Sequence, residues 1–322
     1  MKAAVYRRYG PPEVVKIEDI PRPTPGPNDI LIRVRATTVS SADWRMRSLS
    51  VPRGFGLLSR LAIGVSAPRK NILGSELAGD VVSVGAQVRN FATGDAVIAF
   101  PGTRLGAHAE YCCVNADARV VKKPAGLSYR TASALAFGGS TALDFFRRAE
   151  LREGERVLIN GGSGAVGSAM LQIAVARGAE VTVVCSAANR ECMQQLGAKR
   201  VVDYAHRDFA SEGHRYDVIV DTVGNAHYSR VREALTAGGR LLLVLATLPQ
   251  LLHAPWVEFT TKHRVYAGPA AERLDDLRTL VEMAAAGQFT PLIDSCLPLN
   301  LIAAAHARVE SGRKRGSVIV EV

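Results

Sequence analysis

Short apolar runs separated by Gly and Pro dominate the first third of the chain. Three such runs read ILIRVRATTV at 30–39, AGDVVSVG at 78–85 and DAVIAF at 95–100. Runs of this length, rich in β-branched residues and bounded by turn-forming residues, are typical of strands. The pattern up to about Pro124 therefore predicts a compact β-rich domain.

Beyond Pro124 the pattern changes to strands that alternate with helices. The expected strands are the apolar runs at 156–160, 180–186, 216–223 and 240–246. Helix-like segments follow the first three, and the third of them, AHYSRVREALTAGG, spans 226–239. Alternation of this kind favours a parallel, doubly wound sheet. Nearer the end, 273–289 has the pattern of an amphipathic helix, and SVIVEV at 317–322 is expected to be a strand that rejoins the first domain.

The stretch NGGSGAVGS at 160–168 lies between the expected strand at 156–160 and a helix pattern of small residues. Three of its glycines match the pattern GxGxxG: Gly162, Gly164 and Gly167. After a strand and before a helix, such glycines let the backbone approach a pyrophosphate, which the first helical N–H groups, here those of Ala165 and Val166, can bind. The motif indicates a dinucleotide site, and a plain tight turn is the alternative interpretation.

The end of the second expected strand bears on which dinucleotide binds. A site for NAD usually has Asp or Glu there to bind the ribose hydroxyls. This chain has Ser186 and Arg190 instead, and no carboxylate occurs before Glu191. Because a guanidinium can hold a 2′-phosphate by charge-assisted hydrogen bonds, the sequence favours NADP(H), although Arg190 can also be an ordinary surface residue.

Composition places few limits on partners. The chain has 322 residues, of which 48% are hydrophobic, and a net charge of +10, so a nucleic-acid ligand is possible but not indicated by any basic run with interleaved aromatics. Five cysteines form no disulfide framework. No apolar run is long enough to cross a bilayer and the first residues lack a signal-peptide pattern, so we expect a cytoplasmic enzyme with no membrane partner.

Several segments together resemble the medium-chain dehydrogenase/reductase superfamily, in its zinc-independent quinone oxidoreductase branch. They include the stretch from residue 2 to Arg47, LGSELAGDVVSVGAQVRNFATGDAVIAF, GGSGAVGS, CSAANRECMQQLGAKRVVDY and DTVGN. The resemblance implies an α/β fold, with a Rossmann domain of doubly wound parallel sheet at 125–267 and a GroES-like β-rich catalytic domain built from 1–124 and the return segment 268–322. It also implies an active site in the cleft between the domains and a homodimer.

Zinc members of this superfamily have a cysteine ligand where this chain has Ser40, and a His-Glu pair where it has Ser75 and Glu76. A pair of hydroxyls does not replace thiolate and imidazole as zinc ligands, so we expect no metal. Hydride transfer to an apolar quinone or α,β-unsaturated carbonyl then becomes more plausible than an alcohol dehydrogenase reaction, which remains an alternative. The sequence is also compatible with an NADPH-binding protein without turnover and with an RNA-binding, crystallin-like protein.

The candidate donors to a developing oxyanion are Ser40, Arg45 and Arg47. The resemblance implies an Asn in this segment and sometimes a Tyr where this chain has Arg45; the chain departs on both counts, so the proton donor is not carried over. Further positions match the cofactor contacts that the resemblance implies: Thr141, Tyr204, Gly224, Leu245, Ala246 and, from the other domain, Arg315.

Residues 48–72 form an apolar and basic excursion that the family pattern does not account for. Loops of this size in a compact domain are usually functional or flexible. We interpret the excursion as a wall or lid of the substrate pocket, with Phe55, Leu57 and Leu58 facing an apolar ligand. A helix on a membrane surface is the alternative.

Overall fold

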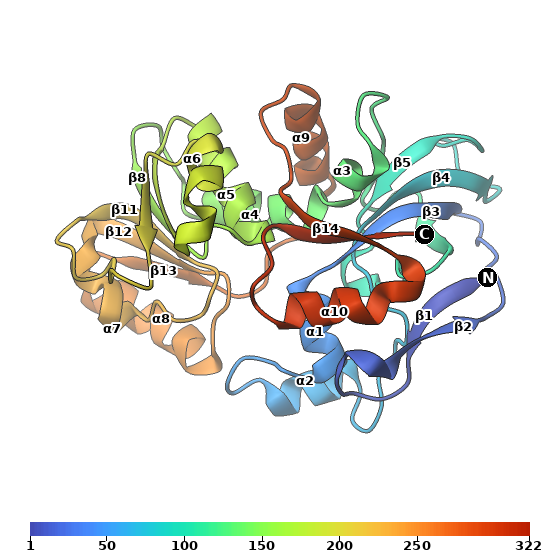
Figure 1. Cartoon of the computed structure of the whole chain (residues 1–322), viewed down its shortest axis with the longest axis horizontal. Coiled ribbons are helices and arrows are strands. Elements are labelled where there is room, and N and C mark those ends of the chain that lie inside the picture. The colour runs from blue at the N-terminus through green and yellow to red at the C-terminus, as the bar shows by residue number, and fades with distance from the viewer. The chain divides into compact units, whose positions relative to one another are not determined.

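The computed structural model describes residues 1–322 and divides them into two units (Figure 1). The β-rich unit contains Met1–Val51, Gly56–Phe137 and Glu272–Val322, and the parallel-sheet unit contains Pro52–Phe55 and Gly138–Ala271. Pro52–Phe55 joins the second unit because the backbone N–H of Leu248 donates to the carbonyl of Arg53 at 3.0 Å.

The β-rich unit is built on two sheets. Its strands are β1 (Lys2–Tyr6), β2 (Val15–Asp19), β3 (Asp29–Val39), β4 (Leu77–Val84), β5 (Ala96–Ala99), β6 (Tyr111–Asn115), β7 (Val120–Lys122), β14 (Ile293–Pro298) and β15 (Ser317–Glu321). Its helices are α1 (Ser41–Ser48), α2 (Gly56–Ile63), α3 (Tyr129–Ser133), α9 (Leu274–Ala285) and α10 (Ile302–Glu310). One sheet pairs β1 with β2, and the larger has the order β14-β15-β3-β4-β5-β7, with β6 also paired to β3.

Strand β15, near the end of the chain, pairs with β3 in the β-rich unit, where the sequence predicts that the chain returns to its first domain. The two strands are antiparallel, with Val318 opposite Val39 and Ile319 opposite Thr38. Most residues of β3 are buried, whereas Arg33 and Arg35 are exposed, as expected for a largely apolar strand in the middle of a sheet. The strands predicted at 30–39, 78–85 and 95–100 are confirmed as β3, β4 and β5.

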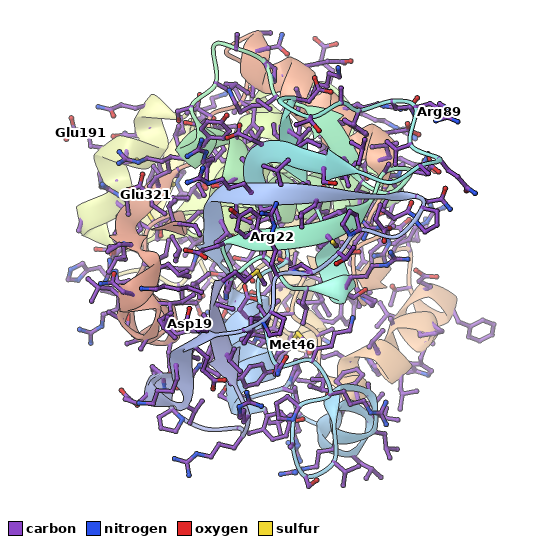
Figure 2. The ribbon with its side chains drawn as sticks, turned by 90° about the vertical axis from the view of Figure 1, so that its right-hand side faces the viewer. Asp19, Arg22, Met46, Arg89, Glu191 and Glu321 are labelled. Carbon is purple, nitrogen blue, oxygen red and sulfur yellow. The ribbon has the colours of Figure 1, made fainter.

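Helix α3 belongs to the β-rich unit, although the predicted boundary at residue 125 assigned it to the second domain. Arg130 of α3 forms a bidentate ion pair with Glu321 of β15, at 2.7 and 2.9 Å, and Figure 2 labels Glu321. Tyr129 donates a hydrogen bond to Asp80 of β4. The middle segment of the β-rich unit therefore extends to Phe137, and the last segment of this unit begins at Glu272 rather than at residue 268.

The parallel-sheet unit has the doubly wound topology that the alternating pattern predicted. Its strands are β8 (Arg156–Asn160), β9 (Glu180–Cys185), β10 (Arg200–Asp203), β11 (Tyr216–Asp221), β12 (Leu235–Leu243) and β13 (Arg264–Ala267). Its helices are α4 (Ala136–Arg148, of which the first two residues belong to the other unit), α5 (Ala165–Ala176), α6 (Arg190–Gln195), α7 (Tyr228–Val231) and α8 (Leu248–Thr260). The order β10-β9-β8-β11-β12-β13 changes direction between β8 and β11, and such a switch point is where dinucleotides bind.

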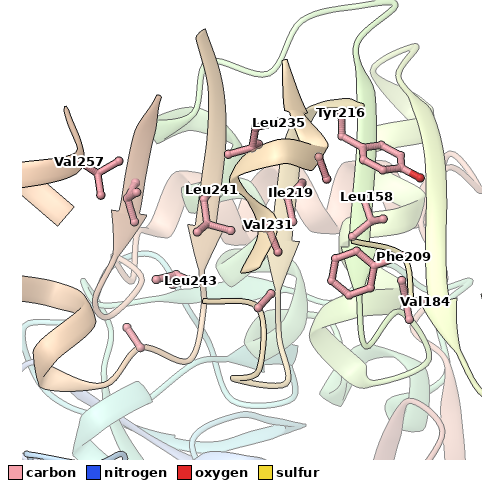
Figure 3. Close-up of a cluster of buried hydrophobic side chains, with 14 of the residues drawn as sticks. Leu158, Val184, Phe209, Tyr216, Ile219, Val231, Leu235, Leu241, Leu243 and Val257 are labelled. Atoms are coloured by element: carbon pink, nitrogen blue, oxygen red, sulfur yellow. The ribbon is translucent and has the colours of Figure 1, made fainter. Parts of the chain in front are cut away.

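Buried aliphatic side chains from neighbouring strands hold this sheet together. Leu158 of β8, Ile219 of β11 and Leu241 of β12 are fully buried in one cluster with Phe209 and Val231 (Figure 3). The cluster therefore packs β8, β11 and β12 together at the middle of the sheet.

The helix predicted over 226–239 is wrong for most of its length. Only α7, four residues long, is α-helical, and a single 3₁₀ turn links it to β12, which begins at Leu235. Gly238 has a φ of +80° and Gly239 follows it, a pair that disfavours a helix, and the register between β11 and β12 shifts at this point. Burial of Leu235 in the core of the sheet favours the strand instead.

The amphipathic helix predicted within 273–289 is confirmed as α9. No helix in the chain combines the length and the apolar content that a membrane span requires.

Candidate functional site

The glycine-rich loop joins the carboxyl end of β8 to the first turn of α5. The backbone N–H groups of Gly161 and Gly162 donate to the carbonyl of Val184, at 3.1 and 3.2 Å, which ties the loop to the end of β9. Gly161 has a φ of +85°, in the left-handed region that favours glycine. Helix α5 begins with Gly164 as its N-cap, and no side chain caps it. Its first N–H groups therefore remain available to an anion.

The three glycines of the motif differ in what a side chain would meet. A Cβ on Gly162 would lie 2.3 Å from a methyl group of Val183, and one on Gly167 would lie 2.2 Å from the carbonyl oxygen of Gly161. A Cβ on Gly164 would meet only Gly161 O, at an ordinary 3.6 Å. Packing of the fold thus excludes side chains at Gly162 and Gly167, whereas Gly164 borders open space at a helix N-terminus.

The loop after β11 lies beside the glycine loop. Asp221 is fully buried and accepts hydrogen bonds from the side chain of Asn160 (2.9 Å) and from the backbone N–H groups of Val223, Gly224 and Ala226 (2.8–3.0 Å). These bonds fix Gly224, which has a φ of +95°, at the carboxyl end of β11. Sequence reasoning missed Asp221, although a carboxylate that ends a buried strand just before a glycine is a signal for such a turn.

Predicted ribose-phosphate contacts gather at the ends of β9 and β10. Ser186 follows β9, Arg190 begins α6 with an exposed side chain, and Tyr204 follows β10 and is 65% exposed. One Nη of Arg190 donates to the carbonyl of Val201 at 3.3 Å, which holds the guanidinium near these strand ends. Asp203 is buried, and one of its oxygens accepts from the backbone N–H of Ala205 at 3.1 Å.

The other predicted cofactor positions fall into two groups. Thr141 on α4 is half-buried, while Leu245 and Ala246 follow β12 in the parallel-sheet unit. Arg315 is exposed in the β-rich unit, where its backbone N–H donates to Asp294 at 2.7 Å. The structure therefore brings all of the predicted cofactor positions except Arg315 into one unit.

This arrangement fits a dinucleotide. The open space at Gly164, the uncapped start of α5 and the position at the switch point are the features that a pyrophosphate requires. Ala165 and Val166 are the first two helical residues, and their N–H groups would bind the phosphate oxygens.

Ser40 is committed to the start of α1. Its hydroxyl donates to Oδ2 of Asp43 at 2.6 Å and accepts from the backbone N–H of Asp43 at 3.2 Å, which forms a capping box. The other carboxylate oxygen of Asp43 accepts from the backbone N–H of Gly74 at 2.8 Å. Since a hydroxyl has a single proton, this geometry does not leave Ser40 free to donate to a substrate, which corrects the role suggested by the sequence.

Arg45 and Arg47, two residues apart on α1, have different surroundings. Arg47 is fully buried, donates to the carbonyl of Gly10 and pairs with Glu310 of α10 at 2.6 Å. This placement supports a structural role for Arg47 instead of the expected contact with substrate. Arg45 is half-buried, stacks on Trp44 with its guanidinium carbon 4.8 Å from the ring, and uses one Nη for the carbonyl of Ser50. Burial lowers the pKa of Arg45 from its ordinary value, and its other N–H groups remain available.

Ser75 and Glu76, at the positions of the family's second zinc ligand pair, are both buried. Glu76 accepts hydrogen bonds from the Thr38 hydroxyl at 2.5 Å and from the Phe137 N–H at 2.7 Å. Burial raises the pKa of Glu76 to about 7. The chain contains no group of three or more His, Cys, Asp or Glu side chains arranged to hold a metal ion.

Residues of the 48–72 excursion belong to different units. Phe55 lies in the short segment that packs with the parallel-sheet unit, whereas Leu57 and Leu58 lie on α2 in the β-rich unit. The continuous wall expected from the sequence is therefore divided between the two units.

Two family models match the chain. The alcohol dehydrogenase GroES-like domain matches residues 26–125, and the zinc-binding dehydrogenase model matches residues 196–320. The first of these confirms the GroES-like domain that was expected in the β-rich unit.

Known proteins match three quarters or more of the chain. A quinone oxidoreductase of Rattus norvegicus is 33% identical over 253 residues, which are 76% of this chain and 73% of the rat protein. The 2-methylene-furan-3-one reductase of Solanum lycopersicum is 28% identical, and the match spans 99% of this chain and 79% of the tomato protein. The structure of the quinone oxidoreductase from Coxiella burnetii matches with a TM-score of 0.88 and 27% sequence identity. The match spans 100% of this chain and 99% of the Coxiella chain.

The matched domains, the relatives and the glycine loop agree on one class of protein. The chain belongs to the medium-chain dehydrogenase/reductase superfamily, in its quinone oxidoreductase-like branch, and is an oxidoreductase with a nicotinamide dinucleotide as its cofactor.

Proposed function

We propose that the protein is a zinc-independent, NADPH-dependent oxidoreductase that transfers hydride to an apolar quinone or α,β-unsaturated carbonyl. The observation that carries the proposal is the open cradle at Gly164, at the switch point of the parallel sheet, with Arg190 and Ser186 at the end of β9. The rat and tomato relatives act on a quinone and on a conjugated ketone by their names, which supports the class of acceptor.

Binding of the cofactor is divided among the loops of the parallel-sheet unit. Gly164, Ala165 and Val166 would hold the pyrophosphate, and Arg190, with Ser186 and Tyr204 near it, would hold the 2′-phosphate. When bound, the nicotinamide supplies the hydride. The loop that Asp221 holds rigid would position the nicotinamide ribose beside Gly224, because a loop fixed by four hydrogen bonds does not need to be ordered on binding.

Arg45 is the residue that we assign to the oxygen of the acceptor. A hydride added to a quinone or enone places negative charge on an oxygen, and preorganised donors lower the barrier by stabilising that charge. Of the three candidates on and before α1, only Arg45 has unbonded N–H groups on a side chain that is not fully buried, since the Ser40 hydroxyl is bonded to Asp43 and Arg47 is completely enclosed by the fold. Stacking on Trp44 orients its guanidinium.

Zinc independence rests on the donor set. The positions of the expected ligands hold Ser40, whose proton is bound by Asp43, and Ser75. Neither supplies the thiolate or imidazole that zinc prefers.

We expect the protein to act in the cytoplasm as a homodimer, as the sequence suggested. Strand β13 is an edge of the parallel sheet, and an unpaired edge presents backbone groups that a second copy can bind. Size-exclusion chromatography with light scattering measures the mass of the protein in solution. A monomer at micromolar concentration would contradict the expected homodimer.

The proposal is tested by NADPH oxidation with 1,2-naphthoquinone and with 1-octen-3-one. Two samples of NADPH are used, one deuterated on one face of nicotinamide C4 and the other on the opposite face. We expect turnover of at least one acceptor, with deuterium in the reduced enone or a primary isotope effect on quinone reduction. Absence of turnover of both acceptors, with NADPH bound at saturation, would refute hydride transfer and leave a binding protein.

A further inference from the structure

Helix α2 is apolar and yet has no buried residue. The side chains of Leu57, Leu58 and Leu61 are 73%, 53% and 53% exposed, and Val65, two residues after the helix, is 59% exposed. Single exposed apolar residues are common on protein surfaces, but four within nine positions of one segment require a partner. We call these four residues the α2 face.

The spacing of the leucines places them on one side of the helix. Leu57 and Leu61 are four residues apart and Leu58 and Leu61 are three apart, so their side chains are neighbours on the helix surface. The three leucines of the α2 face therefore form a continuous apolar stripe.

The end of α2 is anchored to the β-rich unit. The hydroxyl of Tyr9 donates to the carbonyl of Gly64 at 2.8 Å, and the backbone N–H of Arg69 donates to the carbonyl of Ile63 at 2.9 Å. Lys70 donates to the carbonyls of Thr103 and Arg104, at 2.9 and 3.1 Å. The stripe is thus presented by a fixed element whose own apolar side chains remain outside the core.

The segment that carries the α2 face has charges of one sign only. Between Asp43 and Glu76 the chain has no acidic residue and six basic ones. Four of the basic residues are exposed, and none of the four forms an ion pair: Arg53, Arg60, Arg69 and Lys70. Arg60 and Arg69 donate to the carbonyls of Val65 and Ala62, which keeps both guanidinium groups beside the apolar stripe.

We propose that the α2 face docks onto the surface of an anionic lipid bilayer, in place of the expectations from the sequence that the protein has no membrane partner and that Leu57 and Leu58 face the substrate. An apolar stripe flanked by Arg and Lys is the pattern of a helix that lies in the membrane interface, with leucines among the upper acyl chains and cations at the headgroups. A second copy of the same face is disfavoured as the occupant, because it would bring the same four unpaired cations against each other.

Docking would give the site access to an acceptor that dissolves in lipid. The purpose of docking rests on the proposed function, whereas lipid binding stands on α2 alone. The two are separated experimentally because vesicle binding needs no turnover.

The test is cosedimentation of the whole protein with sucrose-loaded vesicles of phosphatidylcholine, with and without phosphatidylglycerol. We expect binding only to the anionic vesicles, and weaker binding at high salt. Leu61→Glu should reduce the partition coefficient at least about tenfold, or roughly 1.4 kcal/mol, and Leu61→Glu/Val65→Glu should reduce it further. Leu301→Glu is the matched control, since Leu301 is 48% exposed in the same unit, and it should bind as wild type does.

Folding of each variant is checked by circular dichroism and by its melting temperature. Equal binding of wild type and Leu61→Glu, equal binding to both vesicle types, or no sedimentation with either would overturn the proposal. A loss of self-association in Leu61→Glu would overturn it too, by showing that the α2 face is a protein interface. Reduction of 1,2-naphthoquinone, assayed in parallel without vesicles, should be unchanged in Leu61→Glu, and failure of the wild type to turn over both this quinone and 1-octen-3-one would refute the proposed function instead.

Discussion

A single methyl group added to each glycine of the motif in turn should separate cofactor binding from folding. In Gly164→Ala the new Cβ lies 3.6 Å from Gly161 O, an ordinary contact, and the backbone φ of −75° suits an L-residue. In Gly167→Ala the new Cβ lies 2.2 Å from the same oxygen. One variant therefore adds an atom to open space where we place the pyrophosphate, and the other adds it inside the fold.

The magnitudes follow from these distances. Alanine is a poorer N-cap than glycine by roughly 0.5–1 kcal/mol, and this is offset by about 0.4–1 kcal/mol from the smaller conformational freedom of the unfolded chain. Gly164→Ala should thus change the free energy of unfolding by less than about 1 kcal/mol. Gly167→Ala forces backbone atoms apart and should cost about 1–3 kcal/mol or more. The Kd for NADPH should rise at least about tenfold in Gly164→Ala, or about 1.4 kcal/mol, because its methyl group obstructs close approach of the phosphates.

Chemical denaturation without cofactor measures stability, and quenching of intrinsic fluorescence by NADPH measures Kd. Gly162→Ala, whose Cβ would lie 2.3 Å from a methyl group of Val183, is a second packing control and should lose stability as Gly167→Ala does. The reasoning is refuted if Gly164→Ala binds NADPH as wild type does, or if it loses as much stability as Gly167→Ala.

Four further predictions concern the cofactor, the acceptor, zinc and pH. NADPH should bind at least about tenfold more tightly than NADH, or 1.4 kcal/mol, and Arg190→Ala should remove the preference; equal Kd values for the wild type by titration would contradict this. Arg45→Ala should lower kcat/KM about a hundredfold, or 2.7 kcal/mol, with the Kd for NADPH nearly unchanged; a change confined to Kd would exclude a role at the acceptor. Purified protein should contain no stoichiometric zinc because Ser40 and Ser75 occupy the ligand positions, whereas elemental analysis that finds one zinc per chain, lost on chelation together with activity, would disprove it. Burial raises the pKa of Glu76 from 4.5 to about 7, so its contribution to stability is complete below pH 4.5 and is lost as the pH rises through about 7. Glu76→Gln should accordingly gain about 3 kcal/mol of unfolding free energy relative to wild type between pH 4.5 and 8, and denaturation curves with a constant difference across this range would show that folding does not raise the pKa of Glu76.

Much of the fold could be predicted because its main signals are local. Apolar runs of strand length and the GxGxxG pattern need only a few neighbouring residues, and they predicted β8, β9, β11 and the loop before α5. The error at 226–239 arose because a run with helix-like spacing there is overridden by a partner: Leu235 packs into the sheet, and the glycine pair forms the irregular start of β12.

The domain boundary could not be predicted from texture alone. Residues 125–137 come after Pro124, where the strand-helix alternation starts, but α3 is held by Arg130 to Glu321 and by Tyr129 to Asp80. Glu321 is 191 residues from Arg130 in the sequence, and no local pattern indicates such a pair.

The candidate site shows the same division between local and distant signals. The segment Ser40-Ser-Ala-Asp43 has the spacing of a capping box, so the sequence already contained the evidence that the Ser40 hydroxyl caps α1 and is not free for a substrate. Arg47 gave no such signal, because its partner Glu310 is 263 residues away. Once Ser40 and Arg47 are excluded as donors, Arg45 is the one remaining candidate that can stabilise the negative charge on the acceptor oxygen. The chemistry proposed for this protein therefore depends on Arg45, at a position where the family resemblance implied that a Tyr sometimes occurs, so a variant at Arg45 tests the departure and the mechanism together.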